Sequence, residues 1–220
     1  DDGGVHLGLK EGIDKNQMLT DLKCAQEGRI SFNAEKYVNK FHAKKHDHFL
    51  IPAGTIHCSS KNCMVLEISV TPYIFTFKLW NWDRLVLDVL PRPIHIEDGE
   101  KNIQWNRTTS WVKDNLVNHV EVIHDGDDYL EERTGLHELE FIETRRFTSN
   151  QITYHQTDHG FNMLNLVEGQ TALVESPKNE FEPYTVHYAE TFIVPANVKE
   201  YTIRPLNDET IKVIKAYVRN

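Results

Sequence analysis

The chain has 220 residues, enough for one large domain or two small ones with a core each. Its net charge is −9 at pH 7, and no Lys/Arg cluster is interleaved with aromatic residues, which argues against a nucleic-acid-binding surface. No apolar run approaches the ~18 residues of a membrane span, and no secretion leader is visible. We expect a soluble protein without nucleic-acid or membrane partners.

The cysteines indicate a reducing environment. Cys24, Cys58 and Cys63 are odd in number and form no CxxC pair, so neither a disulfide framework nor a thiolate zinc site is indicated. A cytoplasmic location fits this usage best. The first segment, "DDGGVHLGL", has no Met and turns apolar at once, so we expect a piece of a longer protein.

Two helices are expected early in the chain, as a helical insert at about residues 10–42. In residues 13–28, Asp14 precedes Gln17 by three positions as in a capping box, and Gly28 ends the pattern. Its apolar stripe consists of Met18, Leu19 and Leu22. A shorter helix is expected in residues 33–42, "NAEKYVNKFH", with Asn33 as its cap.

Short β-rich runs dominate after Phe49. Residues 62–70, "NCMVLEISV", predict a buried strand that contains Glu67. Residues 73–82, "YIFTFKLWNW", alternate between two faces and place Lys78 in the middle of a strand, between aromatic residues. Clustered Trp80, Trp82 and Trp105 are interpreted as packing residues.

Residues 91–135 mix Pro, Gly and charged residues and contain one short helix near residues 111–116, which is typical of a connection between domains. Strands return after this segment. Residues 161–176, "FNMLNLVEGQTALVES", predict a hairpin that turns at Glu168 and Gly169.

The segment "HDHFLIPAGTIH", residues 46–57, predicts a strand at residues 48–51, then a sharp corner and a second strand. Pro52 fixes φ and Gly54 accepts backbone angles that other residues avoid, so His57 would begin the second strand. The segment aligns without gaps with residues 189–200, "AETFIVPANVKE", with Pro52 over Pro195 and His57 over Glu200. This internal repeat of strand, Pro-Ala corner and strand implies two copies of one β-barrel module.

The corner resembles the second metal motif of the cupin barrel, with His46 in place of the first Gly. The ordered set "FLIPAGTIH", "MVLEIS", "YIFTFKLWNWDR" and "RPIHIE" resembles the zinc-dependent class I mannose-6-phosphate isomerases, over nearly the whole chain. The resemblance implies a mostly β fold of two cupin (jelly-roll) barrels with a short helical insert. Residues 1–90 would form a partial first barrel, 91–135 a connector and 136–220 a second, metal-free barrel.

That family isomerises mannose 6-phosphate and fructose 6-phosphate through a zinc-stabilised enediol. Its zinc is held by a Gln/His pair, a Glu and the corner histidine, and only the last maps onto this chain, at His57. One imidazole cannot hold catalytic zinc, which typically takes three protein ligands and a water. We therefore expect the other ligands upstream of this chain, and this chain alone to be inactive. The oligomeric state is not predicted.

The resemblance also suggests residues around the substrate, a sugar phosphate. The family carries an arginine near the sugar where this chain has Lys78, which keeps the charge but loses the planar fork. Lys78 is thus the candidate for stabilising charge in catalysis, while Arg84 and His95 are candidates for binding substrate.

Each candidate residue has a simpler interpretation. His57 could be a hydrogen-bonded core residue, and Lys78 could lie along aromatic neighbours with its ammonium in water. Arg84 could pair with Asp83 or Asp88. His46 and His48, two residues apart on one strand, could clip a metal by themselves.

Two other functions are considered, and the first of them stays open. The chain could be a non-catalytic sugar-binding or regulatory cupin, which the lysine and the missing ligands favour. A cupin oxygenase needs two His and a carboxylate, which cannot be assembled from this sequence.

Overall fold

The computed structural model describes residues 3–69, 76–85, 87, 92, 94–135, 137, 140–157 and 160–219. The chain divides into two compact units, residues 1–118 and 119–220. The segment 91–135, which the sequence predicts to be a connector, is therefore shared between the two units. Among the described residues, no helix has the length and apolar character that crossing a membrane requires.

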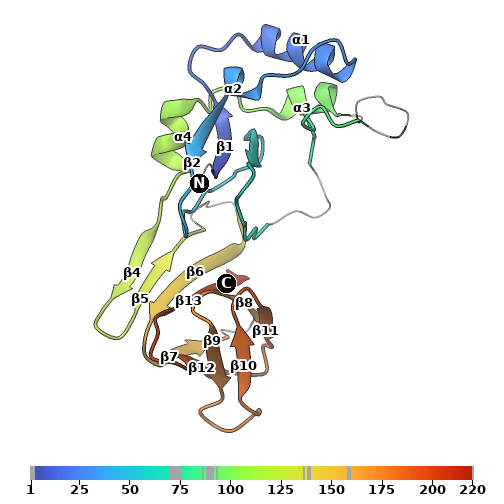
Figure 1. Ribbon diagram of the computed structural model, residues 1–220. Coiled ribbons are helices and arrows are strands. Elements are labelled where there is room, and N and C mark those ends of the chain that lie inside the picture. The colour runs from blue at the N-terminus through green and yellow to red at the C-terminus, as the bar shows by residue number, and fades with distance from the viewer. Residues whose placement is uncertain are drawn as a thin grey trace. The chain divides into compact units, whose positions relative to one another are not determined.

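The described part of the first unit contains helices α1 to α4 (Figure 1) and an antiparallel sheet of three strands in the order β2-β1-β3. Its described elements are β1 (Gly4–Leu9), α1 (Lys15–Gln26), α2 (Ala34–Tyr37), β2 (Val38–His42), β3 (His57–Ser59), α3 (Ile96–Asn102) and α4 (Thr109–Asn115).

Helix α1 begins and ends where the sequence predicts. The Asp14 carboxylate accepts hydrogen bonds from the backbone N–H groups of Asn16 (2.9 Å) and Gln17 (3.1 Å). The capping box is incomplete, because the Gln17 side chain donates instead to Asp21 (2.7 Å). The predicted stripe of Met18, Leu19 and Leu22 is buried in the core of this unit.

The helix expected in residues 33–42 is only one turn long. The chain is helical over Ala34–Tyr37 and then enters β2, which pairs with β1. A single turn is marginal by itself, whereas Val38 and Phe41 suit a strand. Pairing with β1 therefore outweighs the helical pattern.

The prediction of a buried strand at residues 62–70 is wrong within the described residues. Asn62–Ser69 lie outside all strands, and Met64, Val65 and Leu66 are 78%, 58% and 45% exposed. Glu67 is exposed as well. An apolar run becomes a strand only where a neighbouring strand satisfies its backbone groups, and none of the described strands pairs with this run.

The strand expected at residues 73–82 also differs, since Thr76–Trp82 lie outside the strands and residues 73–75 lie outside the described part. The predicted strand 48–51 reduces to a single bridge, Phe49 to Val117. The resemblance also implies a short strand at residues 95–97, "HIE", and this is wrong, because Ile96 begins α3. Acidic side chains in the first turn of α3 favour this helix. The helix expected at residues 111–116 is confirmed as α4.

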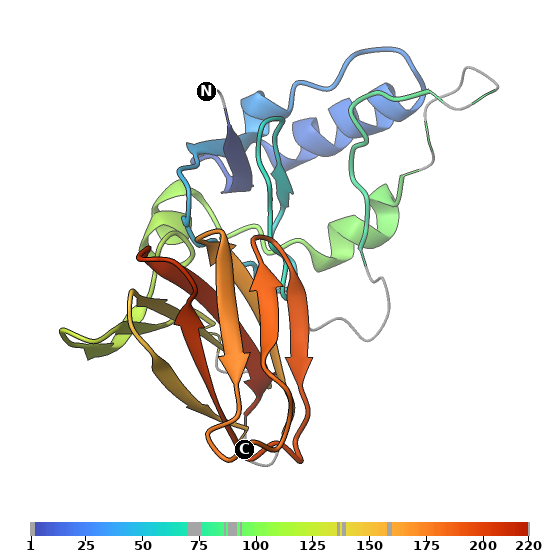
Figure 2. The ribbon, with the colours of Figure 1, turned by 60° about the horizontal axis from the view of Figure 1, so that its bottom comes forward.

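The described residues of the second unit form two antiparallel sheets (Figure 2). One has four strands in the order β10-β9-β12-β7, and the other has six in the order β11-β8-β13-β6-β5-β4. The strands are β4 (Glu121–Asp125), β5 (Leu130–Arg133), β6 (Ile142–Ser149), β7 (Thr153–Gln156), β8 (Asn162–Glu168), β9 (Thr171–Glu175), β10 (Tyr184–His187), β11 (Thr191–Val194), β12 (Glu200–Pro205) and β13 (Ile211–Val218).

The two sheets bury one common core, as a jelly roll requires. Leu164, Leu166 and Val213 come from the larger sheet, and Val174, Tyr201 and Ile203 from the smaller. The prediction of a mostly β cupin fold is confirmed. A barrel in residues 1–90 stays a prediction, because the sheet described there has three strands.

The hairpin predicted at residues 161–176 is wrong in its pairing. The turn at Gly169 is present, with φ +89°, but β8 and β9 enter different sheets. Leu164 and Leu166 of β8 and Ala172 and Val174 of β9 pack into the same core from opposite sides. Their connection therefore crosses the sandwich instead of joining neighbours in one sheet.

A charged cluster spans β5, β6 and the end of the chain. The Glu143 side chain is almost fully buried and contacts Arg133 (2.8 Å), Arg145 (2.6 Å) and Arg219 (2.8 Å). Burial by itself would raise the pKa of Glu143, but hydrogen bonds and charge from Arg145, together with Arg133 and Arg219, hold it below its usual range. Glu143 is therefore ionised inside this unit.

Candidate functional site: the corner that carries His57

The predicted corner before β3 is confirmed. The Thr55 backbone N–H and hydroxyl both donate to the Pro52 carbonyl oxygen, at 3.1 and 2.7 Å. Gly54 has φ +82°, and a Cβ at this position would lie 2.5 Å from the Asn102 carbonyl oxygen. Only glycine fits this backbone without strain and without a clash.

Arg107, which is not part of the corner, stabilises it by hydrogen bonds. Its Nη1 donates to the carbonyl oxygens of Pro52 (2.9 Å) and Ala53 (2.7 Å) and to the Thr55 hydroxyl. The guanidinium carbon lies 5.3 Å from the centre of the Trp111 ring. Burial lowers the pKa of Arg107, although an arginine stays charged at physiological pH. Arg107 was missed at the level of the sequence, since no motif marks it.

His57 begins β3 and is exposed at its side chain. Its Nδ1 lies 2.9 Å from the Thr55 carbonyl oxygen. A carbonyl oxygen can only accept, so Nδ1 carries the hydrogen and Nε2 keeps a lone pair. This is the arrangement of metal-binding histidines, whose second nitrogen donates to a backbone carbonyl or a carboxylate. The imidazole therefore fits a zinc ligand.

One imidazole is not a complete zinc site. Within the described part of the chain, no three His, Cys, Asp or Glu side chains are grouped so that they could hold a metal ion. The alternative metal site at His46 and His48 assumed that both residues lie on one strand. This is wrong, because both lie outside the strands and His46 has φ +69°.

The structure brings Lys78 and His95 together. The Lys78 backbone N–H donates to His95 Nδ1 (3.3 Å), and the His95 backbone N–H donates to the Lys78 carbonyl oxygen (2.7 Å). His95 Nδ1 thus accepts, which leaves the hydrogen on Nε2. Both side chains are exposed, and Lys78 is not in the middle of a strand. No hydrogen bond of the described residues joins either of them to His57.

Arg84 is exposed and does not pair with Asp83 as suggested. The Asp83 carboxylate accepts instead from the Trp80 indole N–H (2.7 Å) and the Ser31 hydroxyl (2.6 Å). Asp88 lies outside the described residues. Trp80 and Trp105 pack against the first core as predicted, whereas Trp82 is 46% exposed.

His6 is a buried histidine that no sequence motif singles out. It lies on β1 directly opposite Cys58 on β3, and its ring is 6.1 Å from that of Trp82. Burial, followed by the charge of Lys40, lowers the pKa of His6, and burial raises the pKa of the Cys58 thiol. Both groups are therefore neutral, and the thiol is a poor nucleophile.

The second unit repeats the corner. The Val198 backbone N–H donates to the Pro195 carbonyl oxygen at 3.0 Å, as Thr55 does to Pro52 at 3.1 Å. Glu200 begins β12 as His57 begins β3, so the corner and the strand that follows it repeat as predicted, whereas a full strand before the corner is described only in the second unit, as β11. The Glu200 carboxylate lies 2.7 Å from the Lys178 ammonium.

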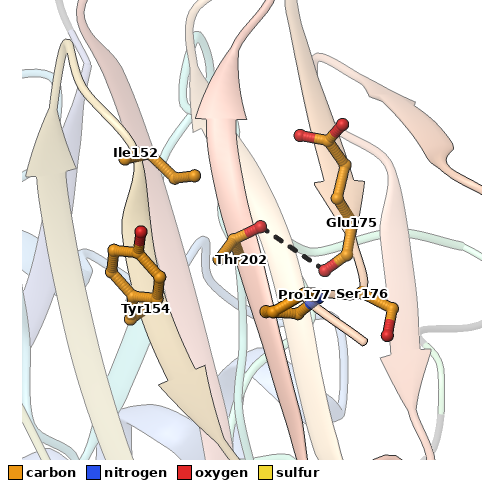
Figure 3. A pocket seen from close by; sticks show the side chains of 6 residues that line it. All are labelled: Ile152, Tyr154, Glu175, Ser176, Pro177 and Thr202. Atoms are coloured by element: carbon orange, nitrogen blue, oxygen red, sulfur yellow. Dashed lines mark hydrogen bonds between the residues drawn. The ribbon is translucent and has the colours of Figure 1, made fainter. Parts of the chain in front are cut away.

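A shallow hollow of about 270 Å³ lies on the four-stranded sheet of the second unit (Figure 3). Thr202 lies between Tyr154 and Glu175 on neighbouring strands and donates to the Glu175 carbonyl oxygen (3.4 Å). The Glu175 carboxylate is bound by Arg204 at 2.8 Å. None of the predicted site residues lines this hollow.

Comparison with known proteins supports the fold and the resemblance. The chain is 25% identical over 178 residues to a Bacillus subtilis (strain 168) protein named "Putative mannose-6-phosphate isomerase YvyI", which covers 77% of this chain. The resemblance to mannose-6-phosphate isomerases is confirmed. No protein-family model matches the chain.

Two solved structures share the fold. The mannose 6-phosphate isomerase from Bacillus subtilis aligns with 99% of this chain at a TM-score of 0.68 and 15% identity. A "putative mannosephosphate isomerase" from Archaeoglobus fulgidus aligns with 100% at a TM-score of 0.64 and 15% identity. The chain spans 49% of the curated relative and 61% and 59% of these two structures.

Proposed function

We propose that a polypeptide containing this chain isomerises a hexose phosphate between its aldose and ketose forms, with mannose 6-phosphate and fructose 6-phosphate as the pair. The observation that carries this proposal is the corner, which holds His57 with Nδ1 on a backbone carbonyl and Nε2 open. The likeness to the curated relative supports the choice of reaction.

His57 Nε2 is proposed as one zinc ligand, and the other ligands would come from outside the described residues. When bound, zinc supplies a Lewis acid that polarises the sugar oxygens at C1 and C2. His57 itself contributes a fixed ring, because the bond to Thr55 leaves one orientation and one tautomer.

The exposed cations and His95 are proposed to act on the substrate. The Lys78 ammonium would stabilise negative charge that develops as a proton moves between the two carbons. Arg84 offers a planar fork to the phosphate group. His95 carries a hydrogen on Nε2, which can donate to a sugar oxygen.

The test uses a polypeptide of the relatives' length, loaded with zinc and assayed with mannose 6-phosphate and with fructose 6-phosphate. We expect turnover of both, loss of it in His57→Ala, and retention in His42→Ala, an exposed histidine on the same sheet. A zinc-loaded protein that turns over neither sugar phosphate contradicts the proposal.

The second candidate function is a non-catalytic sugar-binding or regulatory cupin. It is favoured by the lysine at position 78 and by the absence, among the described residues, of a group of three metal ligands. This candidate predicts that the same polypeptide binds a sugar phosphate in calorimetry but shows no turnover with or without zinc.

A further inference from the structure

Arg107 connects elements that are far apart in the sequence. Arg107 precedes α4, and its side chain contacts Pro52, Ala53 and Thr55 of the corner. These residues lie between 52 and 55 positions before it in the sequence. Its own backbone is fixed as well, because its carbonyl oxygen accepts from the Leu9 N–H at 2.9 Å and its N–H donates to the Gln104 carbonyl oxygen at 3.1 Å. These two hydrogen bonds fix the backbone from which the Arg107 side chain extends.

The hydrogen bonds of Arg107 go to the oxygens of the corner and to no carboxylate among the described residues. The Thr55 hydroxyl is central to this arrangement. It donates its hydrogen to the Pro52 carbonyl oxygen, so it accepts from Arg107 with a lone pair. Arg107 thus holds both ends of the turn that Gly54 makes possible.

Thr55 is also the residue that orients His57. Its side chain accepts from Arg107, and its carbonyl oxygen accepts from His57 Nδ1. Movement of the Thr55 peptide would lengthen the 2.9 Å contact that keeps the hydrogen on Nδ1. The hydrogen could then move to Nε2, the nitrogen that must stay open for a metal.

We propose that Arg107 is the positioning residue of the His57 site: by fixing the Thr55 peptide it keeps His57 in the Nδ1–H tautomer with Nε2 open. The proposal rests on the proposed metal-binding role of His57, to which it adds the residue that prepares the imidazole.

Lysine cannot fully replace Arg107. An ammonium at the end of a flexible chain can reach one of the three oxygens, but it lacks the planar group that lies against Trp111. We therefore expect Arg107→Lys to lie between the wild type and Arg107→Ala. Thr55→Val removes the hydroxyl that Arg107 contacts and keeps the carbonyl oxygen. It therefore tests the contact between Arg107 and Thr55 while Arg107 itself is unchanged.

The experiment is ¹⁵N NMR of the histidine rings in the labelled chain, since Nδ1–H and Nε2–H tautomers give different ring-nitrogen patterns. His57→Ala assigns the His57 signals. Arg29→Ala, the loss of an exposed arginine from the same unit that has no proposed role in the site, is the matched control. Tryptophan fluorescence establishes that each variant is folded in the first unit, which contains all four tryptophans.

We expect wild type and Arg29→Ala to show the Nδ1–H tautomer. In Arg107→Ala the ratio of Nδ1–H to Nε2–H should fall by about fivefold, the effect of losing one hydrogen bond. Thr55→Val should show a smaller fall. An unchanged ratio in folded Arg107→Lys and Thr55→Val overturns the proposal. The readout needs no turnover, so a polypeptide without isomerase activity would contradict the proposed function and leave this inference standing.

Discussion

His155 Nε2 lies 2.8 Å from the Thr153 hydroxyl oxygen, and that hydroxyl donates its hydrogen to the Ile203 carbonyl oxygen at 3.0 Å. The imidazole must therefore carry its hydrogen on Nε2. Its Nδ1 is a buried acceptor that has no hydrogen-bond partner among the described residues. Burial and then the charge of Lys215 lower the pKa of His155 to about 3.

This histidine makes the second unit sensitive to mild acid. In the unfolded chain His155 binds a proton at its ordinary pKa of 6.5, whereas in the folded chain it does so only at about 3. Between these values the unfolded state binds more protons, so stability falls as the pH drops below 6.5, by up to about 1.4 kcal/mol per pH unit for one proton. Above this window His155 contributes no pH dependence.

His155→Phe should remove that dependence. We expect the free energy of unfolding, from urea titrations followed by circular dichroism, to fall less between about pH 7 and pH 5 in the variant than in the wild type. His187→Gln, the loss of an exposed histidine, should behave as wild type. Parallel pH profiles of wild type and His155→Phe would show that His155 titrates normally.

The cluster around Glu143 predicts a large loss of stability from a small change. Glu143→Gln removes the charge that compensates three arginines and should cost about 2 to 4 kcal/mol. Glu121→Gln is the matched control, because Glu121 contacts the same Arg133 at 3.5 Å but is largely exposed, and it should cost under about 0.5 kcal/mol. Equal losses in urea denaturation would argue against the buried cluster.

Alanine substitutions at two glycines distinguish the steric clash at the corner from the strain of a positive φ. Gly54→Ala combines φ +82° with a contact of 2.5 Å to a backbone oxygen, whereas Gly12→Ala has φ +68° and nothing within 4 Å. We expect losses of about 3 and about 1 kcal/mol. Tryptophan fluorescence follows the first unit selectively, and similar losses would mean that the corner yields to a methyl group.

The role proposed for Lys78 predicts that activity depends on the positive charge at this position and not on the shape of the side chain. In the active polypeptide, Lys78→Ala should lower kcat/KM by about 10- to 100-fold, while Lys78→Arg should retain activity because the charge remains. Lys61→Ala, another exposed lysine of the first unit, should have no effect. Wild-type kinetics in Lys78→Ala would remove Lys78 from the site.

The corner and its repeat could be predicted because they depend on local chemistry. Pro52, Gly54 and their counterparts specify a turn by their own backbone preferences. The start of α1 at Asp14 was predictable for the same reason, since a cap involves only the next few residues.

Features that depend on distant partners were not predictable. Residues 62–69 have the composition of a strand, but no described strand pairs with them. The turn at Gly169 was visible in the sequence, yet the sheets joined by β8 and β9 are set by the tertiary core. The role of Arg107 was not predicted, because the oxygen atoms that accept its hydrogen bonds belong to residues more than 50 positions away in the sequence.

The decisive measurement for the role of His57 is the zinc content of the relative-length polypeptide, obtained by elemental analysis of wild type, His57→Ala and His42→Ala. We expect near-stoichiometric zinc in wild type and His42→Ala, and its loss in His57→Ala, because Nε2 of His57 is open at the corner. Stoichiometric zinc that persists in His57→Ala would contradict this role and place the metal elsewhere.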